Sequence, residues 1–217
     1  MTTRKEPHRS RDAMVDALHL TDPRIEAAMR RVPREAFVPD RWRAIAYDDA
    51  PVPLTDEATV SAPHMVALLL EALEVRVGDA VLEVGAGMGY LAAVLAELVG
   101  PTGRVDAIEL DEGLATQAPE RLAREGYGSR VVVHAGDGAP GLPEHAPYDR
   151  IVVSCATREL RHEWKEQLVE GGRLVAPVGN EWEQTLITFI RRGRTGVEEE
   201  GVRCRFVPLR RPGIPHI

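Results

Sequence analysis

The chain has 217 residues, of which 44% are hydrophobic and 28% charged, a composition typical of a single α/β domain with one core. Its formal net charge of -7 argues against a broad nucleic-acid-binding surface, because such a surface needs lysine and arginine to neutralise phosphates. No apolar run approaches the roughly 20 residues of a membrane-spanning helix and the polar start has no signal-peptide pattern, so we expect a cytoplasmic protein that contacts neither membrane nor nucleic acid.

The N-terminal part of the chain predicts one helix and a long irregular segment. TDPRIEAAMRRV places Asp22 at a capping position and Pro23 at the first helical position, with apolar residues every three or four positions after it. Residues 33–53 mix prolines with aromatic residues and have no clear period. We therefore expect residues 1–62 to form a helical and irregular cap on the substrate side of a domain at residues 63–217, the two making one structural unit.

The next part of the chain predicts a buried helix followed by parallel strands. Pro63 opens the apolar stretch HMVALLLEAL, and four apolar, β-branched runs follow with helix-length segments between them. These runs are AVLEV (80–84), RVDAIEL (104–110), RVVVHA (130–135) and DRIVVSC (149–155). Such runs are typical of strands covered on both faces in a doubly wound parallel sheet.

The C-terminal part changes the rhythm. After GGRLVAPVG (171–179), the runs QTLITFIRR (184–192) and GVRCRFVPL (201–209) are joined by a polar connection with no room for a helix. We expect these two runs to pair as an antiparallel hairpin at one edge of the sheet. The predicted fold is thus a Rossmann-like α/β fold with a mostly parallel, seven-stranded sheet.

Cysteine and histidine usage gives no sign of a disulfide or a metal site. Cys155 and Cys204 lie far apart, without a CxxC pair. The seven histidines show no ligand-type spacing with the cysteines or with one another. We therefore predict no metal, and we interpret Cys155 as a small buried thiol.

The turn GAGMG (85–89), directly after the first predicted strand, indicates a ligand site. Ligands of doubly wound sheets bind beyond the carboxyl ends of the strands, and glycine lets a backbone approach them closely. A dinucleotide motif would need glycine where Tyr90 stands, and no lysine follows as in a P-loop. Glu83 precedes the turn, and an acid there favours a ligand with an amino group over a pyrophosphate.

The pattern ExGxGxG from Glu83 to Gly89 resembles the S-adenosylmethionine-binding loop of class I methyltransferases. Glu109 closes the second predicted strand and can accept hydrogen bonds from ribose hydroxyls, as an acid about 20 residues downstream does in nucleotide-binding sheets. Asp137, in GDG after the third strand, stands where those enzymes contact the adenine amine. The predicted cofactor is S-adenosyl-L-methionine, and its predicted binding residues are Glu83, Gly85, Ala86, Gly87, Gly89, Tyr90, Glu109, Leu110, Asp137 and Gly138.

A more specific resemblance extends from about residue 12 to residue 209. VPREAFVP (32–39), AYDDAPVPL (46–54), ATVSAPHMVA (58–67), GDG with PYDRIVV (136–138, 147–153), GGRLVAPVG (171–179) and FVPL (206–209) resemble the protein-L-isoaspartate O-methyltransferase family. The resemblance implies carboxyl methylation of isoaspartyl or aspartyl residues in a protein or peptide, with the ester collapsing to a succinimide. It also implies that Thr59, Ser61 and His64 border the substrate carboxylate, Ser61 being the strongest candidate. We expect a monomer.

The residues themselves leave alternatives open. A carboxylate is already ionised at neutral pH, so the reaction needs aligned hydroxyl donors such as Ser61 and no general base. Yet Ser61 is about equally well placed to cap the helix that Pro63 opens, and His64 is also typical of a packed or capping histidine. A small-molecule or nucleic-acid methyltransferase would leave the matches outside the glycine turn unexplained. A silent binding module would not need the acids at 83, 109 and 137 or Ser61.

Two places depart from the family pattern, SCATREL (154–160) and DEATVS (56–61). Arg158 and Glu159 put charge at a lip that is small and apolar in the family. This departure keeps open a second acceptor, an ordinary aspartate in one ribosomally made peptide, whose methylation would form an aspartimide.

Overall fold

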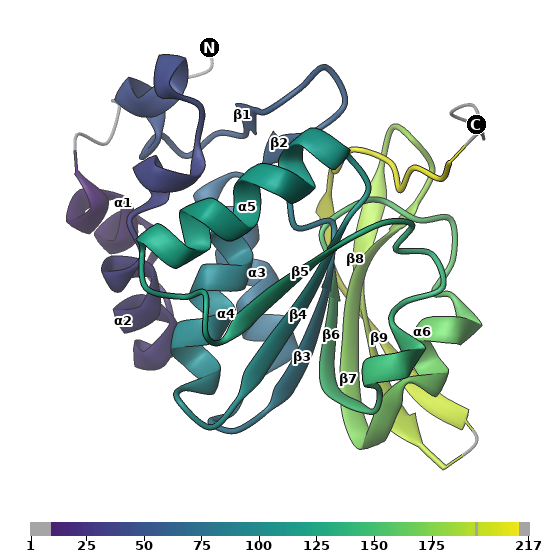
Figure 1. Cartoon of the computed structure of the whole chain (residues 1–217). Coiled ribbons are helices and arrows are strands. Elements are labelled where there is room, and N and C mark those ends of the chain that lie inside the picture. The colour runs from purple at the N-terminus through teal and green to yellow at the C-terminus, as the bar shows by residue number, and fades with distance from the viewer. Residues whose placement is uncertain (1–9, 194, 213–217) are drawn as a thin grey trace.

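The computed structural model of the chain describes residues 10–193 and 195–212, and seven strands among them form one sheet (Figure 1). The sheet order is β5-β4-β3-β6-β7-β8-β9. The pairs from β5 to β7 are parallel, and the pairs β7–β8 and β8–β9 are antiparallel. The strands are β3 (Ala80–Val84), β4 (Arg104–Glu109), β5 (Val131–Ala135), β6 (Tyr148–Val153), β7 (Leu168–Gly179), β8 (Gln184–Arg192) and β9 (Thr195–Cys204). The predicted fold class, including the C-terminal hairpin, is confirmed.

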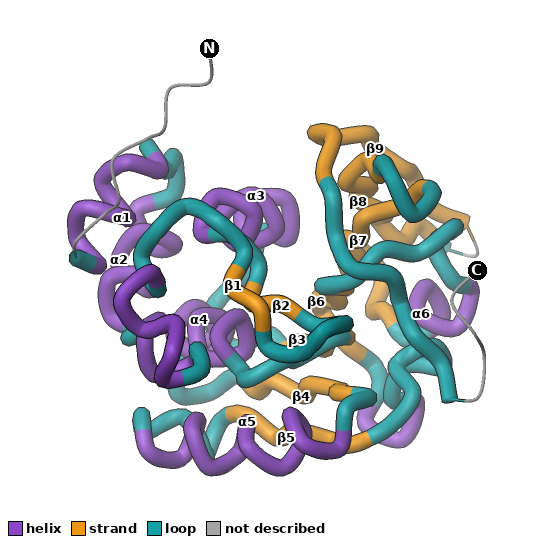
Figure 2. Tube along the Cα trace, turned by 90° about the horizontal axis from the view of Figure 1, so that it is seen from above, coloured by secondary structure: helices purple, strands orange, loops and turns teal. Residues whose placement is uncertain are grey.

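Each face of the sheet has its own apolar core. On one face, α3 (Pro63–Leu73), α4 (Tyr90–Val99) and α5 (Glu112–Arg124) share a cluster with the outer helices α1 (Arg11–Leu18) and α2 (Pro23–Arg31). On the other, η3 (Pro143–His145) and α6 (His162–Glu166) lie over a cluster centred on Tyr148 and Trp164. Figure 2 shows α3 and α4 on one side of the sheet and α6 on the other. Among the described residues, no helix has the length and apolarity to cross a membrane.

The N-terminal cap packs into the same core as α3 and α4. The predicted start of α2 is confirmed, with Asp22 accepting a hydrogen bond from the backbone of Arg24 and Pro23 as its first residue. The irregular segment contains two 3₁₀ helices, η1 (Arg34–Phe37) and η2 (Asp40–Ile45), and ends in β1 (Val52–Pro53), which pairs with β2 (Thr59–Val60). The sequence did not predict α1, which buries only Met14 and Val15.

The second strand of the hairpin lies earlier than predicted. We expected residues 201–209, but β9 begins at Thr195 and ends at Cys204. The polar residues 195–200 can form a strand because β9 is an edge strand, where only the backbone must pair and side chains can remain in solvent. Residues 205–209 leave the sheet, and Val207 and Leu209 bond to the backbone of Ala156 beyond the end of β6.

Coverage of both faces was also predicted for β5, and this is wrong. Val132 on β5 is 53% exposed, and only two residues of this strand, Val131 and Val133, join the core beneath the helices. The cause is position in the sheet, because β5 is the edge strand opposite β9 and its second face lies beyond the cover of α6.

Candidate active site

A cavity lies at the carboxyl ends of β3, β4 and β6. This position is the one that parallel α/β sheets use for their ligands. The predicted cofactor residues on its wall are Gly85, Gly87, Glu109, Leu110 and Gly138. Residues 57–59 and 207–210 also line this cavity.

A second pocket adjoins the first and shares four of its residues, Thr59, Gly85, Gly87 and Ser154. It adds Ser61, Glu83, Ala86 and Tyr90, four more of the predicted site residues. Strand β2 therefore brings the predicted acceptor residues Thr59 and Ser61 to the same glycine turn that borders the first pocket. Neither pocket is lined by His64, Gly89 or Asp137.

The glycine turn needs its glycines for two different reasons. Gly85 and Gly87 have φ of +93° and +55° and expose their backbone to the cavity, where the amide of Gly87 donates to Glu109 Oε2 at 2.7 Å. Gly89 also has a positive φ, but it faces away, and a Cβ there would lie 3.1 Å from Leu122 of α5. Gly89 thus permits close packing of α5 and does not line the cavity.

Glu83 is a buried acid, and one of its carboxyl oxygens has no hydrogen-bond partner in the described chain. It is 1% exposed, its Oε1 accepts a hydrogen bond from Ser154 at 3.5 Å, and its Oε2 has no partner among the described residues. Burial, with the nearby carboxylate of Glu109, raises the pKa of Glu83 to about 8. A buried acceptor of this kind is completed by a cationic donor, which fits the ammonium group of S-adenosylmethionine.

Glu109 is held rigidly at the end of β4. Its two oxygens accept hydrogen bonds from the backbone amides of Gly87 and Asp111, at 2.7 and 2.9 Å. Burial raises the pKa of Glu109, and these amides oppose that rise. Each carboxylate oxygen keeps a further lone pair for a ribose hydroxyl.

The carboxylate of Asp137 contacts residues of the protein itself. Its Oδ1 accepts from the amide of Ala139 at 2.8 Å and its Oδ2 lies 3.3 Å from Arg211 Nε, while its neighbours Gly136 and Gly138 line the cavity. The carboxylate stabilises the turn whose glycines form the wall. Its contact with the adenine amine stays a prediction.

At the first turn of α3, the predicted acceptor residues Ser61 and His64 have different surroundings. The cap residue of α3 is Ala62 and no side chain of that residue caps the helix, so the alternative in which Ser61 caps it is wrong. Asp49 takes that role, with its Oδ1 accepting from the backbone of His64 at 3.0 Å and lying 2.7 Å from His64 Nδ1. Within the described chain, the Ser61 hydroxyl has no hydrogen-bond partner and remains available to a ligand.

Arg34 is a site residue that sequence reasoning missed. It is fully buried, and its guanidinium donates to the carbonyls of Ala46 and Ser61, both at 2.8 Å, and lies 4.8 Å from the ring centre of Tyr90. Burial lowers the pKa of Arg34. The arginine therefore ties the cap to both the Ser61 backbone and the start of α4. Its only signal in the sequence is a charge inside the apolar stretch VPREAFVP.

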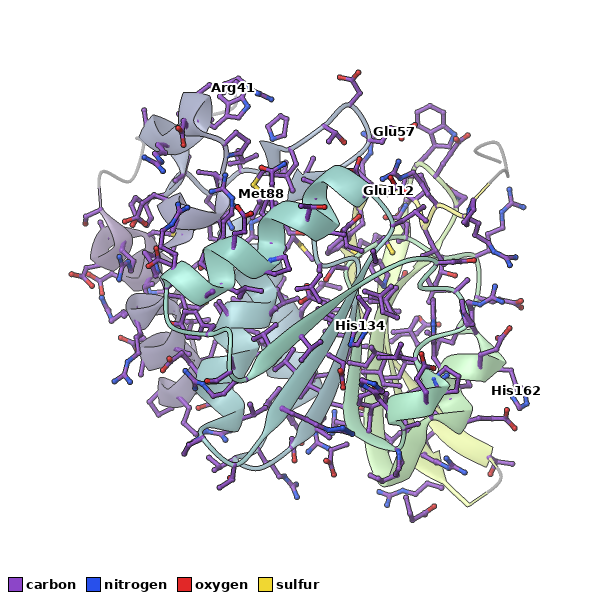
Figure 3. The ribbon with its side chains drawn as sticks, viewed as in Figure 1. Arg41, Glu57, Met88, Glu112, His134 and His162 are labelled. Carbon is purple, nitrogen blue, oxygen red and sulfur yellow. The ribbon has the colours of Figure 1, made fainter. Side chains whose placement is uncertain are left out.

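The segment after β9 is the second element that was missed. Residues 207–210 line the first pocket, and Arg210 forms an ion pair with Glu57 of the loop between β1 and β2. Figure 3 shows Glu57 on this loop, above the ends of the strands. Cys155 also lines the pocket and burial raises its pKa to about 12, so it is a neutral buried thiol as expected. Arg158 and Glu159 are exposed and line neither pocket.

A mostly parallel sheet with a glycine turn after β3, an anchored acid at the end of β4 and an unpaired buried carboxylate between them defines a class I S-adenosylmethionine-dependent methyltransferase. Comparison with known proteins specifies the family. The chain matches the family model of protein-L-isoaspartate(D-aspartate) O-methyltransferase (PCMT) over residues 10–212. The chain belongs to this family, whose cofactor is S-adenosyl-L-methionine.

Relatives with this description are similar over nearly the whole chain. Protein-L-isoaspartate O-methyltransferase 2 of Anaeromyxobacter sp. is 46% identical over 215 residues, which cover 97% of this chain and 87% of the relative. A protein-L-isoaspartate O-methyltransferase of Rhodopseudomonas palustris is 46% identical over 200 residues, covering 91% and 90%.

Solved structures agree on the fold. One protein-L-isoaspartate O-methyltransferase superposes with a TM-score of 0.82 at 30% identity, and this chain spans 65% of its length while 92% of this chain is covered. A Plasmodium falciparum protein described as a PCMT in complex with S-adenosyl-L-homocysteine has a TM-score of 0.83 at 22% identity, covering 94% and 99% of the two chains, and supports the fold alone.

Proposed function

We propose that this protein transfers a methyl group to the free carboxylate of isoaspartyl residues in proteins or peptides. The observation that carries the proposal is the unpartnered Ser61 hydroxyl on the wall that also carries Glu83 and the glycine turn. A carboxylate acceptor needs hydroxyl donors and no base, which is what this wall offers. The names of the relatives support the same substrate class.

On the cofactor side, Glu83 Oε2 would accept from the ammonium group, Glu109 from the ribose, and Gly85 and Gly87 would leave room for the ligand against the backbone. When bound, S-adenosylmethionine supplies a methyl group made electrophilic by the sulfonium. The glycine turn and Glu83 keep that end of the site beside Ser61, since all of them border one pocket.

On the acceptor side, the chain acts by orientation. The substrate carboxylate is ionised at neutral pH and can attack directly. Ser61 and Thr59 would donate hydrogen bonds to one of its oxygens and so direct the other toward the methyl group. Arg34 holds the Ser61 backbone in place for this task. His64 is exposed and lines neither pocket, so we assign the alignment of the carboxylate to Ser61 and Thr59, and a contact with His64 stays a prediction.

The methyl ester then needs no further help from the protein. The next backbone nitrogen of the substrate attacks the ester carbonyl, the nitrogen loses its proton, and methanol leaves as the succinimide ring closes. Hydrolysis of the ring gives both aspartyl and isoaspartyl products, so repeated cycles repair the damaged residue.

We further propose that residues 1–62 are the substrate-side cap, of which residues 1–9 lie outside the described part of the chain. Support comes from β2 and Arg34, which bring this segment to the acceptor pocket. The monomeric state and the cytoplasmic location rest on sequence reasoning alone. The alternative of a dedicated aspartate-modifying enzyme is not favoured, because the relatives are protein-L-isoaspartate O-methyltransferases.

The test offers the protein and its cofactor two peptides that differ only in one residue, isoaspartate or aspartate. We expect the isoaspartyl peptide alone to form first a methyl ester and then a succinimide, and mass spectrometry detects both products. Cofactor binding measured in the same samples shows that the protein is folded. Equal methylation of both peptides, or of the aspartyl peptide alone, would contradict the proposal.

A further inference from the structure

Away from the active site, two histidines meet one carboxylate on the open face of β5. Asp106 of β4 is buried, and its Oδ1 lies 2.9 Å from His134 Nε2 and 2.8 Å from His145 Nδ1. His134 belongs to β5 and His145 to η3, so three separate elements contribute (Figure 3, where His134 is labelled). The sequence analysis predicted no metal, because positions 106, 134 and 145 show no ligand-type spacing.

The donor atoms are of the types that bind a borderline divalent metal ion. Two imidazole nitrogens and one carboxylate oxygen lie within 4.8 Å of one another. Zinc bonds of about 2.0–2.2 Å to nitrogen and oxygen require ligand atoms only slightly further apart than the observed hydrogen bonds. The two rings meet edge to face with their centroids 5.0 Å apart.

The surroundings orient the carboxylate toward the two rings. Tyr148 donates a hydrogen bond to Asp106 Oδ2 at 3.3 Å, which leaves Oδ1 directed at the imidazoles. Arg104 donates to the carbonyl of His145 at 2.7 Å and so fixes the η3 turn. Its Nη1 lies 3.8 Å from Oδ2, and its half-exposed charge opposes a cation while solvent screens it.

We propose that Asp106, His134 and His145 form a zinc site that joins η3 to the sheet. A neutral imidazole carries one proton, so each ring can bind the ion through the nitrogen that now faces Asp106 and keep its proton on the other nitrogen. Both rings are partly exposed, which leaves the fourth zinc position to water. The site would stabilise the connection from β5 to β6, whose residues Gly136 and Gly138 line the cofactor cavity.

The test uses the full chain without an affinity tag, stripped with a chelator and titrated with zinc chloride by calorimetry. We expect saturation at one ion per chain, a higher melting temperature with zinc, and X-ray absorption from nitrogen and oxygen neighbours near 2.0–2.1 Å. His134→Gln and His145→Gln should each weaken binding at least about tenfold. Both positions are partly exposed, so these variants should fold even where Asp106→Asn does not.

His162→Gln is the matched control. It removes another surface histidine that lies 3.1 Å from a carboxylate, that of Glu166, and it should leave zinc binding unchanged. Absence of saturable binding would overturn the site, as would equal affinity in the parent, His134→Gln and His145→Gln. Because all readouts are independent of methylation, their result is separate from that of the peptide test.

Discussion

At the scale of single residues, the site depends on polar atoms that the chain itself leaves without partners. The Ser61 hydroxyl and Glu83 Oε2 are such atoms among the described residues, and both border one pocket. Glu83 Oε2 is buried, and a buried acceptor without a partner is costly in a folded protein unless a ligand completes it. The two atoms therefore identify the site more sharply than the residue types around them.

Ser61→Ala should lower the methylation rate by up to about 100-fold, because the substrate carboxylate loses a donor that aligns it. Cofactor affinity should remain near that of the parent, since Ser61 contacts no part of the glycine turn through a hydrogen bond in the described structure. Single-turnover rates and calorimetry measure the two effects separately. Ser10→Ala, which removes only the cap of α1, is the control. Loss of cofactor binding would contradict the assigned role.

Glu83→Gln should stabilise the ligand-free protein and weaken its hold on the cofactor. The pKa of Glu83 is about 8 in the folded state against 4.5 for the free side chain, so the native state binds a proton more tightly than the unfolded state. Its contribution to stability is complete below pH 4.5 and is lost as pH rises toward 8. The gain from glutamine should therefore be small near pH 4 and largest above pH 8.

Urea unfolding of parent and Glu83→Gln across this pH range measures the difference in stability, and calorimetry measures cofactor affinity. A constant difference across the range would show that the Glu83 carboxyl is not buried in the ligand-free protein.

At the scale of elements, the acceptor wall is assembled by segments without regular structure. Strand β2 has only two residues, and its position depends on Arg34, which bonds to the Ser61 carbonyl, and on the pairing with β1. On the other side of the cavity, Arg210 pairs with Glu57, so the segment after β9 meets the loop between β1 and β2. The cofactor cavity is thus bordered by the loop between β1 and β2 on one side and by the segment after β9 on the other.

Arg34→Lys should lower kcat while leaving cofactor affinity close to that of the parent. Lysine keeps the charge but cannot bond to both carbonyls in the fixed geometry of a guanidinium, so β2 loses one of its anchors. Arg34→Met, which leaves both carbonyls unpaired, should reduce the rate further and cost roughly 1–3 kcal/mol of stability for each lost partner.

Arg130→Lys is the control for this series. Arg130 also donates a hydrogen bond to a backbone carbonyl, that of Ala96, at 2.7 Å, but it lies far from β2 in the chain. Steady-state kinetics with calorimetry distinguish the outcomes. If Arg34→Lys retains the parent kcat, or loses cofactor affinity and kcat together, Arg34 does not act by positioning Ser61.

At the scale of the whole molecule, the elements of the domain were predictable because burial leaves a periodic trace in the sequence. The runs beginning at Ala80, Arg104 and Asp149 are continuous and apolar, as strands in the middle of a parallel sheet must be. The error at β9 has the same cause, since an edge strand in solvent has no apolar pattern by which to recognise it. For β5 the pattern suggested more cover than an edge position provides.

The candidate site was predictable only where a residue's role is local. The turn at Gly85 and Gly87 and the acid at Glu109 follow directly from strand ends, and the structure places all three on one cavity. Asp137, in contrast, has the right position in the chain but turns to Ala139 and Arg211. Spacing along the chain fixes which strand end a residue occupies and leaves its side-chain direction open.

By itself, the sequence determined the order of the central parallel strands, the glycine turn, and the family to which the chain belongs, because these depend on residue types at short spacing. Only the tertiary structure decided that Asp49 and not Ser61 caps α3, that Arg34 reaches the Ser61 carbonyl, and that Asp106 gathers two histidines. Each of these contacts joins residues 15 to 39 positions apart. A side chain's choice among distant partners depends on how the elements pack, and local periodicity carries no record of that packing.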